Sequence, residues 1–247
     1  MITHQAEAIV LRTWPIHEAD LIVSLFTREQ GVIKGVAKAA ARSRRRFGGA
    51  LEPMTHVRAS FAERPKQDLV RLDSFEIVNS PLSHTVDYAR AAALAFYAEV
   101  IEDTLPEQDP QDAIFRLLLA ALEHTRVDGV WLPVTYFALW MTRLLGWLPD
   151  LTRCVQCGAP IAQAPAFFNP SLDGLVCAEH KRGGWSALSP ESQALAGRIF
   201  RSPIGALAGE TWPRNRAVDL RRFGIQALER HIEHRLATVA ALSRLGG

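Results

Sequence analysis

The sequence has few of the features that set a protein's class at once. It holds only three cysteines among 247 residues, an odd count that makes no disulfide framework and suits a reducing compartment. No apolar run reaches the roughly 18 residues that a membrane span needs. The first residues also lack the basic start and apolar run of a signal peptide. We therefore expect a soluble, cytoplasmic protein with no membrane contact.

Signatures of common catalytic sites are missing as well. There is no G-x-S-x-G, no Walker A loop and no G-x-G-x-x-G stretch, so no hydrolase elbow, P-loop or dinucleotide fold is indicated. A deaminase-like His231-Ile232-Glu233 occurs, but it comes after the cysteines and no P-C-x-x-C follows it. The sequence predicts a protein that is not an enzyme.

Charge is distributed unevenly, although the formal net charge is only +2. Residues 1–80 carry 12 Lys/Arg against 9 Asp/Glu, residues 81–150 carry 4 against 10, and residues 151–247 carry 12 against 7. A polyanionic partner would therefore meet the two basic ends, whereas the acidic middle is better suited to packing or protein contacts.

Short β patterns fill the first 80 residues. Five segments combine β-branched or aromatic residues with partial alternation between turn residues: AEAIVLRT, DLIVSLFT, GVIKGVAKA, THVRASFA and LVRLDSFEIV. Arg28 to Gly31 is a connection short enough for a hairpin with glycine at positive φ. Five short strands predict a small barrel, because closure removes exposed strand edges, and the five-stranded barrel that commonly binds oligonucleotides is the OB-fold.

The pattern after Ser80 has a helical period. Capping residues and apolar spacing predict helices over 83–104, from an Asp109 cap towards Gly129, over about 131–145, from Ser189-Pro190 onward, and over about 216–236. The expected fold class is therefore α+β multidomain. Its parts are an OB-fold over 1–80, a first helical part over 81–150, a metal-binding module over 151–188 and a second helical part over 189–247.

The metal-binding module is predicted from two ligand pairs. Cys154 and Cys157 form a C-x2-C, and after nineteen intervening residues Cys177 and His180 form a C-x2-H. Two such knuckles bring four soft or borderline donors to a tetrahedral zinc ion. Four protein ligands leave no position for water, so the expected Zn²⁺ is structural. Reduced thiols without metal are the alternative interpretation.

Residues 31–49 read GVIKGVAKAAARSRRRFGG and carry a run of positive charge with no carboxylate. The six cations are Lys34, Lys38, Arg42, Arg44, Arg45 and Arg46. The two lysines, four apart on an extended strand, are expected on one face, with the arginines continuing it as a loop or a short helical turn. Such a track neutralising about five phosphates would give a single-strand salt slope of about −3.5 without sequence preference.

Two other interpretations of this region stay open. The charge run is also compatible with a solvated, flexible loop. Phe47 and Phe61 are candidate stacking platforms for bases, but either is equally compatible with the core.

Several stretches together resemble one family. They are EAIVLRT, EADLIVSLFTREQG, GVAKAAARSRRRFGGALEP and the junction LLGWLPDLTRCVQCG, and over essentially the whole chain the sequence resembles RecO, the bacterial recombination mediators. The resemblance implies an N-terminal OB-fold, a helical domain and a zinc-bearing module embedded in the helical part.

The resemblance also implies function and partners. Members bind single- and double-stranded DNA, anneal complementary strands and, with RecR, help RecA to displace single-strand-binding protein (SSB), so a nucleoid-associated location is expected. The cations Arg214, Arg216, Arg221 and Arg222 would extend the track or contact the acidic, apolar C-terminal tail of SSB. The alternative is a zinc-containing OB-fold protein that acts as an RNA-associated structural module.

Overall fold

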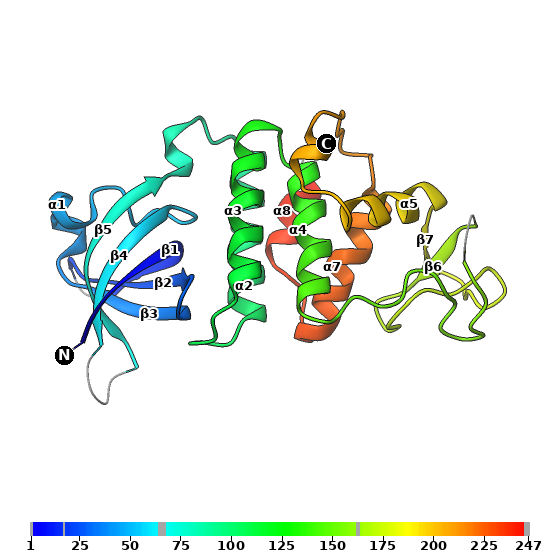
Figure 1. Cartoon of the computed structure of the whole chain (residues 1–247), viewed down its shortest axis with the longest axis horizontal. Helices are drawn as coiled ribbons and strands as arrows, with labels where there is room; N and C mark the ends of the chain where they lie inside the picture. The colour runs from blue at the N-terminus through cyan, green and yellow to red at the C-terminus, as the bar shows by residue number, and fades with distance from the viewer. Residues whose placement is uncertain (1, 17, 64–67, 162–163, 245–247) are drawn as a thin grey trace. The chain divides into compact units, whose positions relative to one another are not determined.

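The computed structural model describes residues 2–16, 18–63, 68–161 and 164–244, without the side chains of Ile2, Ala41 and Arg44. Within these ranges the chain divides into two compact units (Figure 1). The first comprises the chain up to Arg116 together with the segment from Ala237, and the second comprises residues 117–236.

The first unit contains a closed five-stranded barrel. Its strands are β1 (Ile2–Pro15), β2 (Leu21–Thr27), β3 (Gly31–Ala37), β4 (His56–Glu63) and β5 (Val70–Asn79), in the order β1-β2-β3-β5-β4. The β3–β5 pair is parallel and the other pairs are antiparallel. The predicted five-stranded OB-type barrel is confirmed. β1 is longer than predicted because its first half pairs with β4 and its second half with β2.

Alternate residues of the strands form the core of the barrel. Val23, Leu25 and Phe61 are fully buried, as the period of two requires when one face of each strand points inward. The predicted hairpin is present, with Gly31 at φ +70. Phe47 belongs to the same buried cluster as Phe61, so both rings are core residues and the stacking-platform interpretation of them is wrong.

Short helical elements connect the third and fourth strands. They are η1 (Ala40–Arg42) and α1 (Arg44–Phe47), so the basic run takes the helical-turn alternative rather than the loop. Phe47 packs edge-on against Phe75 of β5, with ring centroids 5.4 Å apart. This contact fixes α1 on the barrel.

The first unit also contains helical elements. They are η2 (Pro81–Ser83), α2 (Tyr88–Thr104), the first residues of α3 (Asp112–Val127), and α8 (Thr238–Arg244). Both α2 and α3 begin later than predicted. The α2 helix starts after Asp87, whose carboxylate accepts from the Arg90 N–H at 2.8 Å. The expected start of α3 at Pro110 is wrong because Gln108, at φ +60, donates its N–H to the Val32 carbonyl of β3.

The α8 helix was not predicted from the sequence. Its first turn is held by a carboxylate of α2, since Glu99 accepts from the Ala237 N–H at 2.7 Å and the Thr238 N–H at 2.9 Å. A cap supplied from another helix leaves no local signal, so only the tertiary structure reveals this helix start.

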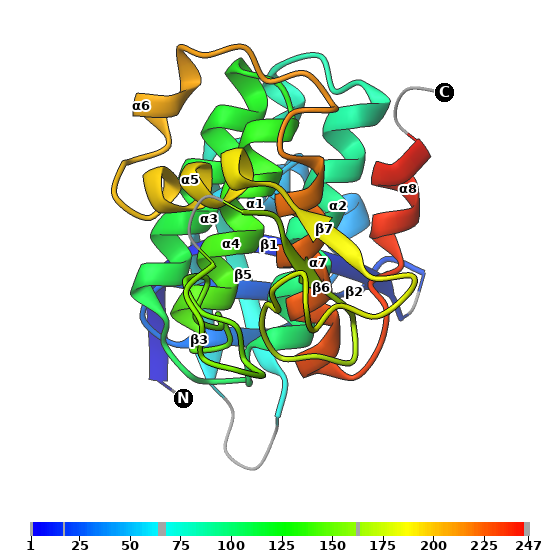
Figure 2. The same ribbon diagram turned by 90° about the vertical axis from the view of Figure 1, so that its right-hand side faces the viewer.

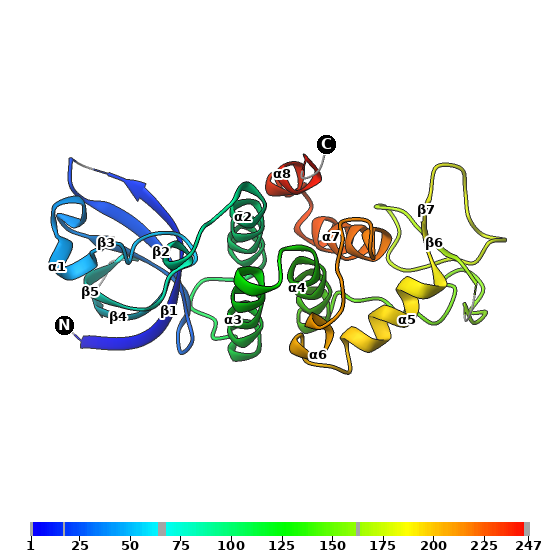
Figure 3. The same ribbon diagram turned by 90° about the horizontal axis from the view of Figure 1, so that it is seen from above.

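The second unit is helical with one small sheet. Its elements are the rest of α3, α4 (Trp131–Leu144), β6 (Ala166–Phe168), β7 (Ser186–Leu188), α5 (Pro190–Ile199), α6 (Gly205–Ala208) and α7 (Val218–Ile232). The helices α4 and α7 lie side by side (Figure 3), and β6 and β7 pair antiparallel (Figure 2). The predicted cap of α5 is confirmed, as Ser189 accepts from the Ser192 N–H. Among the described residues, no helix has the length and apolarity to cross a bilayer.

Candidate metal centre and nucleic-acid interface

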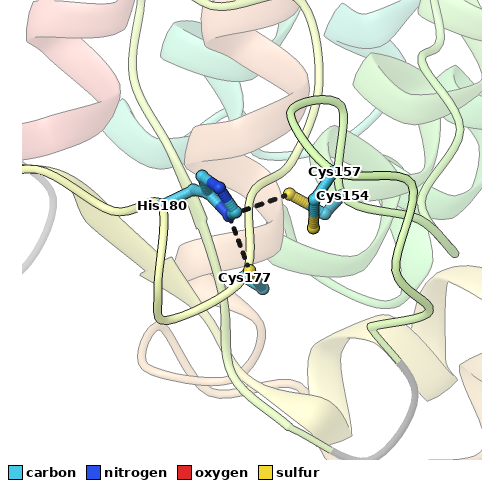
Figure 4. Close-up of side chains that lie close together, drawn as sticks. All are labelled: Cys154, Cys157, Cys177 and His180. Atoms are coloured by element: carbon cyan, nitrogen blue, oxygen red, sulfur yellow. Dashed lines mark hydrogen bonds between the residues drawn. The ribbon is translucent and has the colours of Figure 1, made fainter.

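The four predicted metal ligands converge in the second unit (Figure 4). The Sγ atoms of Cys154, Cys157 and Cys177 and a ring nitrogen of His180 all lie within 4.8 Å of one another. His180 Nδ1 is 3.2 Å from Cys177 Sγ and 3.9 Å from Cys154 Sγ. A tetrahedral zinc ion with its usual bond lengths separates its ligand atoms by about 3.5–3.8 Å. The donor set and its spacing therefore fit this ion.

The first knuckle is the turn of a small hairpin. The Cys154 N–H donates to the Ala159 carbonyl at 2.8 Å, and the Gly158 N–H returns to the Cys154 carbonyl at the same distance. Gly158 has φ +71, a conformation that glycine adopts without strain. The hairpin thus aims two thiols to one side of the chain.

The second knuckle is held against the first by backbone contacts. Val155 donates its N–H to the Leu175 carbonyl at 2.9 Å, and the residue before Leu175 is Gly174 at φ +141. A Cβ at Gly174 would lie 2.3 Å from Cγ1 of Val155. The close approach of the two knuckles therefore requires glycine here.

The backbone around the thiols favours thiolates at two positions. Burial acts to raise the pKa of Cys154, but hydrogen bonds from the backbone of Cys177, Cys157 and Gln156 outweigh it and lower this pKa overall. The pKa of Cys177 is also lowered, because backbone bonds from Glu179 and His180 and a bond from the Cys154 side chain outweigh its burial. Thiolates are the metal-binding form of cysteine.

The exposed third thiol behaves differently. The Ala159 backbone acts to lower the pKa of Cys157, but the neighbouring Cys154 side chain, burial and Cys177 together raise it. The surroundings thus favour deprotonation of Cys154 and Cys177 over that of Cys157, and a bound cation would favour the deprotonated form of all three.

Helix α7 anchors the segment between the two pairs. Arg230 donates to the Leu172 carbonyl at 2.8 Å and pairs with Asp173. His231 stacks flat on Trp147, with ring centroids 4.8 Å apart. This packing gives the deaminase-like His231-x-Glu233 a structural explanation.

The arginine cluster, defined here as Lys38, Arg42, Arg44, Arg45 and Arg46, lies on η1, α1 and the residue that follows β3. The strand β3 ends at Ala37, so Lys38 lies one residue beyond the strand on which it was predicted. The Arg42 side chain is 73% exposed, with Glu18 at 3.4 Å. Lys38 and Arg45 are also exposed. The Arg44 side chain lies outside the described part of the chain.

Arg46 organises the cluster. Its Nη2 donates to the Lys38 carbonyl at 2.5 Å, its Nε donates to Ser43 Oγ at 3.0 Å, and its guanidinium lies 5.1 Å from the ring centroid of Phe47. Because Phe47 is buried, the cluster is tied to the barrel core rather than carried on a free loop.

Lys34 has different surroundings from the rest of the predicted track. It lies within β3, and its Nζ is 2.6 Å from Glu107 Oε1. The structure therefore groups the five cations that follow Ala37. The sixth cation, Lys34, is instead paired with Glu107, in the segment between α2 and α3.

Two of the four C-terminal cations, Arg214 and Arg222, are exposed, and the other two are engaged by residues of the same chain. Arg221 is buried, and burial lowers its pKa to about 10. It donates to the Thr135 hydroxyl at 3.2 Å and lies 4.5 Å from the centroid of the Trp131 ring. Arg216 pairs with Glu210. The expectation that Arg221 extends a DNA track is wrong, because this side chain holds α7 to α4.

The class that the structure defines is a chain with an OB-type barrel that carries a cluster of cations, followed by a helical part with a Cys3His cluster that could hold a metal ion. Comparisons with known proteins show the family. Residues 1–81 match the family described as "Recombination protein O N terminal", and residues 86–239 match "Recombination protein O C terminal".

Similar proteins span nearly the whole chain. A protein named DNA repair protein RecO from Koribacter versatilis is 57% identical over 98% of both chains. Proteins of the same name from Anaeromyxobacter sp. (strain K) and Syntrophotalea carbinolica are 33% and 34% identical, over 96% and 91% of this chain and 95% and 83% of their own. The chain belongs to the RecO family.

Proposed function

We propose that this protein is a DNA-binding recombination mediator that acts without bond chemistry. It binds single- and double-stranded DNA through residues 1–80, anneals complementary strands and, with RecR, promotes loading of RecA on DNA coated with SSB. The observation that carries the proposal is the exposed arginine cluster on a barrel of a chain that matches its relatives from end to end. The site of action would be the cytoplasmic nucleoid.

Annealing follows from charge neutralisation. Cations that contact phosphates on two strands lower the repulsion that opposes their encounter and leave the base edges free to pair. Arginine and lysine contacts to phosphate carry no sequence information, which suits a protein that accepts any strand.

The metal is proposed to be a structural Zn²⁺ held by Cys154, Cys157, Cys177 and His180. When bound, it supplies charge neutralisation and cross-linking of the two knuckles, and it takes no part in a reaction.

The partner groove is proposed to lie beside α5. A groove of about 400 Å³ is lined mainly by apolar side chains, among them Leu148, Leu151 and Phe200, and also by Asp150. The Arg143 guanidinium lies 4.8 Å from the centroid of the Phe200 ring. An apolar groove with a cation at its rim suits the acidic, apolar tail of SSB. Arg143→Ala is expected to weaken binding of a tail peptide about tenfold, whereas Arg182→Ala leaves it unchanged.

Annealing of SSB-coated complementary oligonucleotides tests the main proposal. The variant Arg42→Ala, Arg44→Ala, Arg45→Ala, Arg46→Ala should lose annealing, and its single-strand salt slope should fall by about 3. The control carries the same charge change on exposed arginines elsewhere, Arg116, Arg182, Arg235 and Arg244. Binding of RNA in preference to DNA, without annealing, would instead favour the RNA-associated structural module.

A further inference from the structure

A second set of cations lies on the outer face of the barrel. Arg12 of β1 is paired in register with Ser24 of β2, and Ser24 with Lys34 of β3. Strands are spaced by roughly 5 Å, so the Arg12 and Lys34 backbones are about 10 Å apart across one row. Trp14, two residues after Arg12 in β1, is half-buried. The Arg12 guanidinium lies over its ring, 5.7 Å from the ring centroid. Cations interleaved with an aromatic ring are the composition of single-strand-binding surfaces.

These cations form ion pairs with carboxylates of the same chain. Arg12 pairs with Glu102 at 2.9 Å and Lys34 pairs with Glu107 at 2.6 Å. Arg28, in the β2–β3 turn, donates to Asp112 at 2.7 Å as well as to Glu7. Three of the carboxylates that follow the barrel in the sequence, Glu102, Glu107 and Asp112, therefore each meet one cation of its outer face.

The exposed ion pairs are not needed to dock the helices. Docking is carried by buried groups, since Phe26 packs edge-on against Phe115 with ring centroids 5.4 Å apart. The Gln108 N–H donates to the Val32 carbonyl at 2.9 Å. Lys34 and Glu107 are 42% and 51% exposed, and an exposed pair adds little to stability. Glu102 is only 12% exposed, so its pair with Arg12 is the one that burial strengthens.

Two polar atoms at this contact lack partners. Within the described ranges, Glu102 Oε1 and Ser24 Oγ are buried without a hydrogen-bond partner. A buried polar atom left unpaired costs free energy, so this contact is not arranged for greatest stability. Its consistent feature is charge, since each of the three cations meets a carboxylate from the segment that follows the barrel.

We propose that Glu102, Glu107 and Asp112 stand in for phosphates on a latent single-strand face made by Arg12, Trp14, Arg28 and Lys34, and so confine DNA to the arginine cluster. The inference rests on the proposed DNA binding of the same barrel. It explains why the acidic middle of the sequence follows the basic barrel directly, and it makes Lys34 a cation of the latent face.

Neutralising the carboxylates tests the inference in the full chain. In Glu102→Gln, Glu107→Gln, Asp112→Asn, the single-strand salt slope should become steeper by about 1.4, because Arg12 and Lys34 are released at roughly 0.7 each while Arg28 keeps its partner Glu7. The control Glu123→Gln, Asp128→Asn, Glu191→Gln changes the net charge equally within the second unit and should leave the slope as it is. Equal slopes for the neutralised variant and this control would overturn the inference.

A second pair of substitutions separates the face from a general charge effect. Arg12→Ala with Lys34→Ala should not change the slope of the otherwise unaltered protein, and should remove about 1.4 from the slope of the neutralised variant. A lower slope in the unaltered background would show that DNA already contacts these cations and would also contradict the proposal. If the triple variant does not fold, Glu107→Gln alone, at an exposed pair, should steepen the slope by about 0.7.

The same titrations separate this inference from the proposed function. DNA binding by the neutralised variant but not by the unaltered protein would support the latent face and contradict the proposed function. Binding by neither would overturn both. Binding by both with the same slope would overturn the latent face alone.

Discussion

The barrel and the metal segment, residues 151–188, are stabilised by different interactions. Each is a short stretch rich in β and turn residues, but the barrel closes its strands into one ladder around a buried cluster. The segment 151–188 contains two three-residue strands and isolated bridges. A closed ladder satisfies its backbone and buries apolar area without help, whereas a segment with so little of either depends on a ligand cluster. We therefore expect the metal to stabilise segment 151–188 alone and the apolar core to stabilise the whole barrel.

Loss of a metal ligand should have the largest effect. Cys154→Ser removes the buried thiol of the cluster, so we expect one zinc per chain to be lost, since a structural site carries about 10–16 kcal/mol of binding free energy. Hydrogen exchange should rise across 151–188 and stay unchanged in β1 to β5. Ser171→Ala, in the same segment, is the control. Faster exchange in the barrel strands would contradict the expectation that the metal acts only locally.

Truncation of the barrel core is the complementary change. Phe61 is fully buried, so Phe61→Ala should cost about 3–5 kcal/mol through lost burial and a cavity. Chemical denaturation of the barrel should shift by this amount while the zinc content stays at one. Ser60→Ala serves as the neighbour control. Zinc release at denaturant concentrations that leave the variant folded would contradict the separation of the two regions.

The knuckle contact gives a smaller effect. Gly174→Ala forces an L side chain into φ +141 and against the stiff Val155, which should weaken zinc binding by about 1–3 kcal/mol. Gly183→Ala, with open space around it and no positive φ, should bind zinc as tightly as the unaltered protein. Competition with a chromophoric chelator measures both affinities, and equal values for the two variants would show that Val155 moves aside freely.

Asp219 tests the helical part that follows the metal segment. Its carboxylate accepts from the Ser189 N–H and the Leu220 N–H, each at 2.8 Å, and from the Ser192 hydroxyl at 2.5 Å. Burial acts to raise the pKa of Asp219, but these hydrogen bonds outweigh it and hold the pKa below 3.8. Asp219→Asn should therefore cost about 1–2 kcal/mol at neutral pH, because both carboxylate oxygens accept and the amide NH2 that replaces one of them leaves a partly buried donor unpaired.

The pH dependence of this effect has a defined sign. Since the folded pKa lies below the unfolded value, the stabilisation by Asp219 is present above about pH 4 and is lost as the pH falls through the folded pKa. The difference between Asp219→Asn and the unaltered protein, measured by urea denaturation, should shrink below pH 4. A difference that stayed constant down to pH 2 would assign the effect to packing instead.

Local patterns predicted most of the elements and the whole ligand set. The strand alternation around Val23 and Leu25 and the cysteine spacing are local in sequence, and both were confirmed as a barrel and a cluster. The helix at Thr238 was missed because its cap comes from Glu99, which is distant in the sequence, and α3 begins at Asp112, later than the Asp109 cap predicted. Arg221 looked like a surface cation because an arginine buried by cation–π and backbone contacts has the same local pattern as an exposed one.

The sequence by itself determined the class of this protein, because periodicity and ligand spacing are properties of neighbouring residues. The tertiary structure decided what surrounds each cation. Lys34 and Arg42 belong to one charge run, yet Lys34 is 42% exposed and meets Glu107, 73 residues away, whereas Arg42 is 73% exposed and meets the exposed Glu18 at 3.4 Å. Charge pairing depends on distances in space that the order of residues does not contain, so the basic run could be recognised in the sequence but the partner of each cation could not.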